Sequence, residues 1–217
     1  MKENKRNTTL KSMILLCSFL LIGITVTGCT RDEGISFGTV GKQEVRLGDF
    51  AYELWDTNNS YIADSDYYRE NYDIDVFEGE DITENIKDEA YNKLLRVYIL
   101  ADRAIEEGET LSTALQEDDN RRAKGILGEL DAEFVSRYKI NEKNLSRYLD
   151  YQSLAGIWFG KRIDELKVEA EKNSDDTLSE NEIRLKAYEL FEEEYVEMLS
   201  GADISLDDSL RNEVSLP

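Results

Sequence analysis

The chain has 217 residues and is strongly acidic, with 47 Asp and Glu side chains against 26 Lys and Arg, a net charge of −21 and no histidine. A nucleic-acid partner is not expected, because binding a phosphate backbone requires a basic surface that this composition does not supply. The lack of imidazole excludes a Ser-His-Asp or Cys-His nucleophile, a His-ligated zinc site and a histidine proton shuttle.

The first 29 residues have the pattern of a secretory signal. Four basic side chains lie within the first eleven residues and precede an apolar run from Met13 to Val26. A helix over this run would reach roughly 21 Å, which is too short to span about 30 Å of hydrocarbon. The run ends in Val26-Thr27-Gly28-Cys29, which resembles the lipobox of bacterial lipoproteins. We therefore expect residues 1–28 to be a cleaved signal peptide and Cys29 to carry the lipid that anchors the protein to the extracytoplasmic face of the cell membrane.

The expected mature chain, of about 189 residues, suits a single domain. Cys17 would leave with the signal peptide and Cys29 would be lipidated, so we expect no intramolecular disulfide and a domain stabilised by its apolar core. We interpret residues 29–37 as a tether and residues 38–217 as one helical domain.

The domain is predicted to open with a short hairpin. Val40 and Val45 flank Gly41-Lys42, and a helix is expected to start near residues 47–49.

A long helix is predicted next, over about residues 82–107. Between Ile86 and Ile105 the apolar residues recur at spacings of three and four, which is the period of a one-sided helix. Asp81 and Glu84 are expected to form a capping box at its start, and Gly108 a left-handed stop at its end.

Three further elements are expected in the second half. One helix begins near Ser112 and fades around residues 139–141, where Asn141 caps a helix that is apolar on more than one face. After a polar break at residues 172–176, Ser179 and Glu182 are expected to form the capping box of a closing helix.

The closing helix is predicted over about residues 179–200 and is expected to stop at Gly201. Residues 201–217 are predicted to be extended, because their apolar positions alternate with a period of two. We expect the terminal strands to pair. The predicted fold is therefore mainly α, a bundle of long helices with short terminal β-strands.

The order of these parts resembles the helical peptide-binding region of the extracytoplasmic foldases PrsA and SurA, which is similar to the substrate-binding region of trigger factor. The matching segments lie within Val40–Phe50, Ile86–Gly108 and Tyr138–Leu145, in a likeness that spans about residues 38–170 with a return at 183–206. Members that act as prolyl isomerases carry a parvulin domain with active-site histidines, which is missing here. The resemblance implies the peptide-binding region without prolyl isomerase activity.

Aromatic side chains are the candidate peptide contacts, because Tyr and Trp offer a large contact area with a polar edge. The candidates form an early group and a later one, and are Tyr52, Trp55, Tyr61, Tyr67, Tyr68 and Tyr72, then Tyr148, Tyr151, Trp158 and Phe159. A competing interpretation places Tyr52, Trp55, Tyr148 and Phe159 in the core. Tyr67, Tyr68 and Tyr72 are the stronger candidates for a surface, because residues 60–80 are polar and acidic as well as aromatic.

Acidic residues accompany these tyrosines, at Asp64, Asp66, Glu70 and Asp73. If they rim a groove, clients with basic residues beside apolar ones are favoured, and salt weakens binding because the Debye length is about 8 Å at physiological strength.

We therefore expect a membrane-anchored, non-catalytic, chaperone-like lipoprotein that binds unfolded or extended segments of secreted polypeptides and uses no cofactor or metal. An alternative is a scaffold lipoprotein for one dedicated extracytoplasmic partner. An enzyme or a small-solute receptor is the third class. No carboxylate pair stands out by its spacing as in glycosidases, and the long helices lack the alternating strands and helices typical of solute receptors.

Overall fold

The computed structural model describes residues 34–72, 76–77, 82–172 and 178–216, and these form a mainly helical domain with a few short antiparallel strands, as predicted. Cys29, the signal peptide and the first part of the tether lie outside the described residues, as do Asp73 and Asp81. The domain begins earlier than predicted. Strand β1 starts at Ser36, inside the predicted tether, because Phe37 is buried in the core.

A three-stranded antiparallel sheet joins the beginning of the domain to its end. Strand β1 (Ser36–Val40) pairs on one side with β2 (Gln43–Arg46) and on the other with β3 (Ile204–Leu206). The predicted hairpin and the predicted pairing of terminal strands are both confirmed. Gly38 permits the close approach of β1 and β3, since its φ is +135° and a Cβ there would lie 1.9 Å from the backbone oxygen of Ser205.

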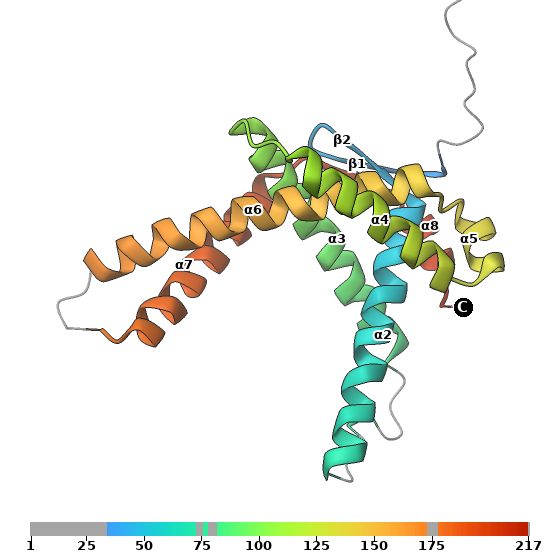
Figure 1. Ribbon diagram of the computed structural model, residues 1–217, viewed down its shortest axis with the longest axis horizontal. Helices are drawn as coiled ribbons and strands as arrows, with labels where there is room; N and C mark the ends of the chain where they lie inside the picture. Colours follow the sequence, from blue (N-terminus) through green and yellow to red (C-terminus); the bar gives the residue numbers. More distant parts are fainter. Residues whose placement is uncertain (1–33, 73–75, 78–81, 173–177, 217) are drawn as a thin grey trace, which may run out of the picture. The chain divides into compact units, whose positions relative to one another are not determined.

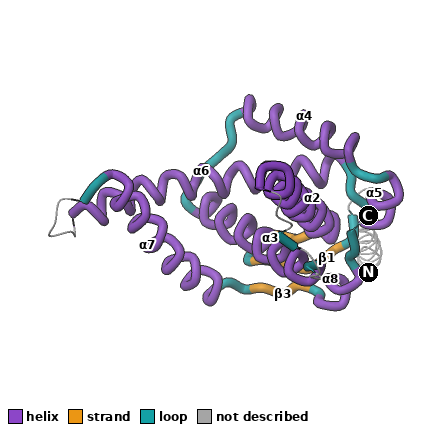
Figure 2. Tube along the Cα trace, turned by 90° about the horizontal axis from the view of Figure 1, so that it is seen from below, coloured by secondary structure: helices purple, strands orange, loops and turns teal. Residues whose placement is uncertain are grey.

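The longest helix, α6, is at the centre of the packing of the long helices. In chain order they are α2 (Leu47–Tyr72), α3 (Thr83–Glu106), α4 (Thr113–Glu129), α5 (Ala132–Tyr138), α6 (Glu142–Lys172), α7 (Glu180–Gly201) and α8 (Asp208–Glu213). Helix α6 contacts α3, α4 and α7, and α2 runs beside α3 (Figures 1 and 2).

The core has two parts. One surrounds Phe50, Leu94 and Leu149, between the hairpin, α2, α3 and the first half of α6. The other surrounds Leu166 and Phe191, between α3, α6 and α7.

Several helix ends have the side-chain caps and the glycine stop that the sequence predicts. Ser112 accepts a hydrogen bond from the backbone N–H of Leu115, and Asn141 from that of Asn144. Ser179 and Glu182 form a reciprocal capping box. Gly108 has a φ of +82°, which is the predicted left-handed stop.

Helix α3 has Ile82 as its N-cap, and the predicted capping box of Asp81 and Glu84 involves Asp81, which lies outside the described residues. Three local predictions were wrong. The predicted helix over residues 112–139 is two helices, because the Asp131 carboxylate accepts the backbone N–H groups of Glu133 and Phe134 and starts α5. Gly201 is still helical, as the last residue of α7, and Ala202 is the C-cap.

The third wrong prediction concerns the extended end. Residues 208–213 form α8 instead, because Asp207 caps them by accepting the backbone N–H groups of Ser209 and Leu210.

Replacing Gly38 should break the β1–β3 pairing. We expect Gly38→Ala to lower the free energy of unfolding by at least about 2 kcal/mol, because the new Cβ meets backbone atoms and the positive φ is strained for alanine. Gly125→Ala in α4 is the matched control. Its Cβ meets nothing within 4 Å, so it should stabilise by up to about 1 kcal/mol. Urea unfolding followed by circular dichroism measures both, and equal effects would contradict the prediction.

Candidate functional site

A buried carboxylate, Asp49, connects four elements at the start of α2. It is 2% exposed and accepts hydrogen bonds from the backbone N–H of Arg46 (2.9 Å), the hydroxyl of Tyr98 (2.7 Å) and the guanidinium of Arg147 (2.7 Å). Arg147 also donates to the backbone oxygen of Glu44 in β2. Burial raises the pKa of Asp49, while these partners oppose the rise. The network fixes α3 and α6 against the hairpin.

A second buried carboxylate lies one turn further along α2. Glu53 accepts hydrogen bonds from the hydroxyl of Tyr148 and the side-chain amide of Gln152, both at 2.7 Å. The pKa of Glu53 is raised, mainly by burial. Neither carboxylate is among the residues predicted from the sequence. Their i, i+4 spacing beside Phe50 and Leu54 was the available signal, because it puts two acids on the buried side of a helix.

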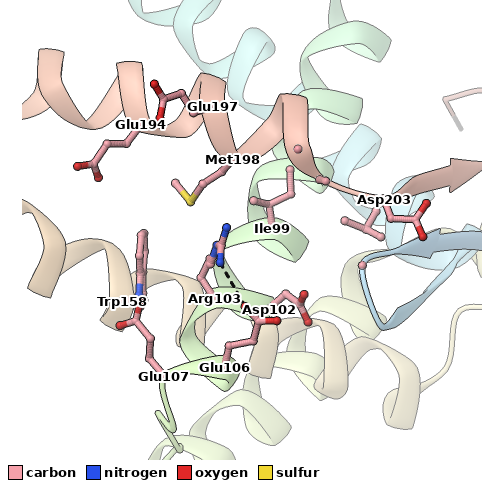
Figure 3. Close-up of a pocket in the computed structure, with 14 residues that line it drawn as sticks. Ile99, Asp102, Arg103, Glu106, Glu107, Trp158, Glu194, Glu197, Met198 and Asp203 are labelled. Carbon is pink, nitrogen blue, oxygen red and sulfur yellow. Dashed lines mark hydrogen bonds and ion pairs between the residues drawn. The ribbon is translucent and has the colours of Figure 1, made fainter.

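A cleft of about 710 Å³ opens between the β1–β2 turn, α3, α6 and the last turns of α7 (Figure 3). Its apolar lining includes Ile99, Trp158 and Met198, from three different helices. Six of the lining residues are acidic, namely Asp102, Glu106, Glu107, Glu194, Glu197 and Asp203. The cleft therefore combines an apolar floor with a strongly negative rim.

The negative charge of this cleft is only partly compensated. Arg103 is the one basic residue in the lining, and it pairs with Glu106, which Lys42 also contacts. Arg162 pairs with Glu194. Within the described residues, no ion pair involves Glu107, Glu197 or Asp203, the three acidic residues that we call the free rim acids.

A smaller cleft, of about 410 Å³, lies between α2, α3 and α6. Val97, Leu100 and Phe159 line it, together with Glu53 and Arg96. The Arg96 guanidinium pairs with Glu192 of α7 and lies over the rings of Phe191 and Tyr195. Arg96 therefore connects the lining of this cleft to α7.

The predicted aromatic contacts divide into buried and exposed groups. Tyr52 and Tyr148 lie in the core, as the competing interpretation held, so neither can contact a peptide in this structure. Trp158 is 7% exposed and lines the larger cleft.

Four of the predicted peptide contacts are partly buried, namely Trp55, Tyr61, Tyr151 and Phe159. Two of them hold elements together through their hydroxyls, since Tyr61 donates to Glu89 of α3 and Tyr151 to Gln43 of β2. Trp55 packs against Tyr52, and Phe159 packs against Phe191 and Tyr188. These four residues therefore have mainly structural contacts.

Tyr67, Tyr68 and Tyr72 form an exposed cluster near the end of α2, which we call the tyrosine cluster. Their ring centroids lie 5.6 to 6.1 Å apart, and the side chains are 54%, 41% and 58% exposed. Ile62 and Val76 add exposed apolar surface to the same part of the chain. Of the acidic residues expected around the tyrosine cluster, Asp64 and Glu70 are exposed, and Asp66 is half-buried and pairs with Arg69. Asp73 lies outside the described residues.

Comparison with known proteins gave no relatives. No family model matches the chain, and no curated protein or solved structure matches it either. Among the described residues, no helix has the length and apolar character needed to cross a bilayer.

Two neighbouring carboxylates, Asp119 of α4 and Asp150 of α6, lie where these helices pack together. Asp119 is buried and accepts hydrogen bonds from Ser153 (2.7 Å) and Arg122 (2.9 Å). Burial, followed by the charge of Asp119, raises the pKa of Asp150 from 3.8 to about 6. Near neutral pH, this pair therefore opposes the packing of α4 on α6.

Replacing Arg147 should be costly, because Asp49 would remain buried without its counter-charge. We expect Arg147→Met to lower the free energy of unfolding by about 3–5 kcal/mol. Arg137→Met is the control, since Arg137 forms an exposed pair with Glu133, and it should cost less than about 1 kcal/mol. Urea unfolding gives both values. A loss for Arg147→Met no larger than that of the control would show that Asp49 does not need this partner.

Asp150→Asn should remove one source of pH-dependent instability. The folded-state pKa of Asp150 lies above its ordinary value, so its stabilising contribution is present below about pH 4 and is lost as pH rises through about 6. We expect the variant to gain up to about 1 kcal/mol over wild type at pH 7.5, reduced from the full shift by partial exposure, and little at pH 4. Urea unfolding across this range tests the difference, and a constant offset would contradict it.

Proposed function

We propose that this protein is a membrane-anchored, non-catalytic lipoprotein with chaperone-like activity, which binds unfolded or extended segments of secreted polypeptides. The observation that carries the proposal is the tyrosine cluster, in which Tyr67, Tyr68 and Tyr72 leave about half of each side chain in water. Soluble proteins bury most large aromatic side chains, and a contiguous exposed apolar patch is typical of a binding surface.

The chemistry of the tyrosine cluster suits varied clients. A tyrosine ring packs against any apolar side chain, and its hydroxyl stays hydrated or donates to a peptide carbonyl. The three rings already contact one another in edge-on and tilted arrangements, so little rotamer freedom remains to be lost on binding. Such a surface favours apolar and extended segments without requiring a fixed sequence.

The sequence supports the remaining parts of the proposal. The lipobox-like segment ending at Cys29 supports a lipid anchor on the extracytoplasmic face, where unfolded secreted chains emerge. The absence of histidine from the whole chain supports a binding role over prolyl isomerisation of the parvulin type.

The test is suppression of aggregation by a soluble form that begins at Thr30. We expect wild type to delay aggregation of several unrelated unfolded proteins, and the triple variant Y67S/Y68S/Y72S to need at least about threefold more protein for the same delay, because it loses aromatic contact area. Light scattering measures the delay.

The matched control replaces three exposed apolar residues outside the tyrosine cluster, in the variant I105S/L115S/L185S. Their exposed fractions, 41%, 41% and 59%, are close to those of the tyrosines. The control should protect clients as well as wild type does. No protection by wild type would contradict chaperone-like activity, and capture of one stoichiometric partner in its place would favour the scaffold function.

A further inference from the structure

The larger cleft has the shape and composition of a binding site that is separate from the tyrosine cluster. Its volume of about 710 Å³ falls within the range of about 300–1,000 Å³ that is typical of ligand pockets. Met198 projects from α7 into the space between α3, α6 and α7, and Trp158 reaches the same space from α6 (Figure 3). Methionine adapts its shape to different apolar groups, so the floor accepts aliphatic or aromatic side chains.

The charges around the cleft select the sign of what enters. Arg103, the one cation in its lining, already pairs with Glu106. The free rim acids Glu107, Glu197 and Asp203 come from the end of α3, from α7 and from the residue before β3. A concave site lined by one sign of charge concentrates its field and attracts the opposite charge. An anionic ligand would be repelled, and an uncharged ligand would form no ion pair with the free rim acids.

We propose, resting on the proposed chaperone-like function, that this cleft binds client segments in which a lysine or arginine lies beside an apolar residue. The apolar side chain packs on Met198 and Trp158, and the cation reaches the free rim acids. Lysine and arginine suit this arrangement because their aliphatic stems cover apolar surface while the charged ends stay at a polar edge. The tyrosine cluster supplies general affinity for apolar segments, and the cleft adds a preference for basic ones.

The test uses the full chain in micelles of a non-ionic detergent and two labelled peptides. One places Lys-Phe-Leu-Lys in a Gly-Ser background, and the other places Glu-Phe-Leu-Glu in the same background. We expect the lysine peptide to bind at least about fivefold more tightly at low salt, and this preference to shrink at physiological salt. Fluorescence anisotropy gives both affinities, and equal affinity for the two peptides would overturn the proposal.

Isosteric variants locate the effect. E107Q/E197Q/D203N removes the free rim acids with little change in shape, and should reduce the preference for the lysine peptide to less than about twofold. E129Q/E169Q/E171Q changes the net charge by the same amount at exposed residues that do not line the cleft. This control should keep the preference, and its loss in the control would assign the effect to net charge and overturn the proposal.

Fluorescence reports whether the peptide enters the cleft. The chain has two tryptophans, so W55F leaves Trp158 as the only one. We expect the lysine peptide to shift the emission of W55F, and the shift to disappear when the three rim substitutions are added. Binding of the lysine peptide with no change in Trp158 emission would overturn the cleft as its site.

The two proposals fail in different ways. Because the tyrosine cluster does not line the cleft, Y67S/Y68S/Y72S should leave the preference for the lysine peptide unchanged. If wild type does not suppress aggregation, the chaperone-like function is contradicted. If wild type suppresses aggregation but shows no preference for the lysine peptide, only the proposal for the cleft is contradicted.

Discussion

The structure depends on the carboxylate of Asp49, which lies at the start of α2 and is bonded from β2, α3 and α6. Burying a charge without partners costs several kcal/mol of stability. The three hydrogen-bond donors to Asp49 must therefore all be in place when the core forms. Tyr98 and Arg147, which supply two of them, lie on the same helices as Ile99 and Trp158. The position of the larger cleft therefore depends on the hydrogen bonds that Asp49 accepts from these helices.

The order of elements could be predicted from the sequence because each has a local signal. Apolar spacing predicted the long helices, and the Gly41-Lys42 turn predicted the hairpin. The break between α4 and α5 could not be seen in the apolar pattern, since Ile126, Leu130 and Phe134 keep a spacing of four across it. Asp131 was the missed signal, because a capping carboxylate competes with continuation of the helix. Asp207 starts α8 in the same way.

The candidate sites were less predictable than the fold. The polar and acidic neighbours of Tyr67, Tyr68 and Tyr72 correctly indicated a surface, since local composition reflects exposure. Tyr148 has polar neighbours too, yet it is buried. Its hydroxyl can leave water because it donates a hydrogen bond to Glu53, which comes from a distant part of the chain. The acidic cleft gave no recognisable signal. Its residues come from distant segments, and among 47 acidic side chains only tertiary packing identifies the six that line one cleft.

Pairing of β1 with β3 has a consequence for biogenesis. Strand β1 forms its hairpin with β2 early in synthesis, but its second edge is completed only by residues 204–206, near the end of the chain. Contacts so distant in sequence are slow to form, and an open strand edge can recruit other chains in the meantime. A polypeptide threaded outward through the membrane would thus carry an unfinished sheet until its last segment emerged, and would itself pass through the aggregation-prone state from which we propose it protects others.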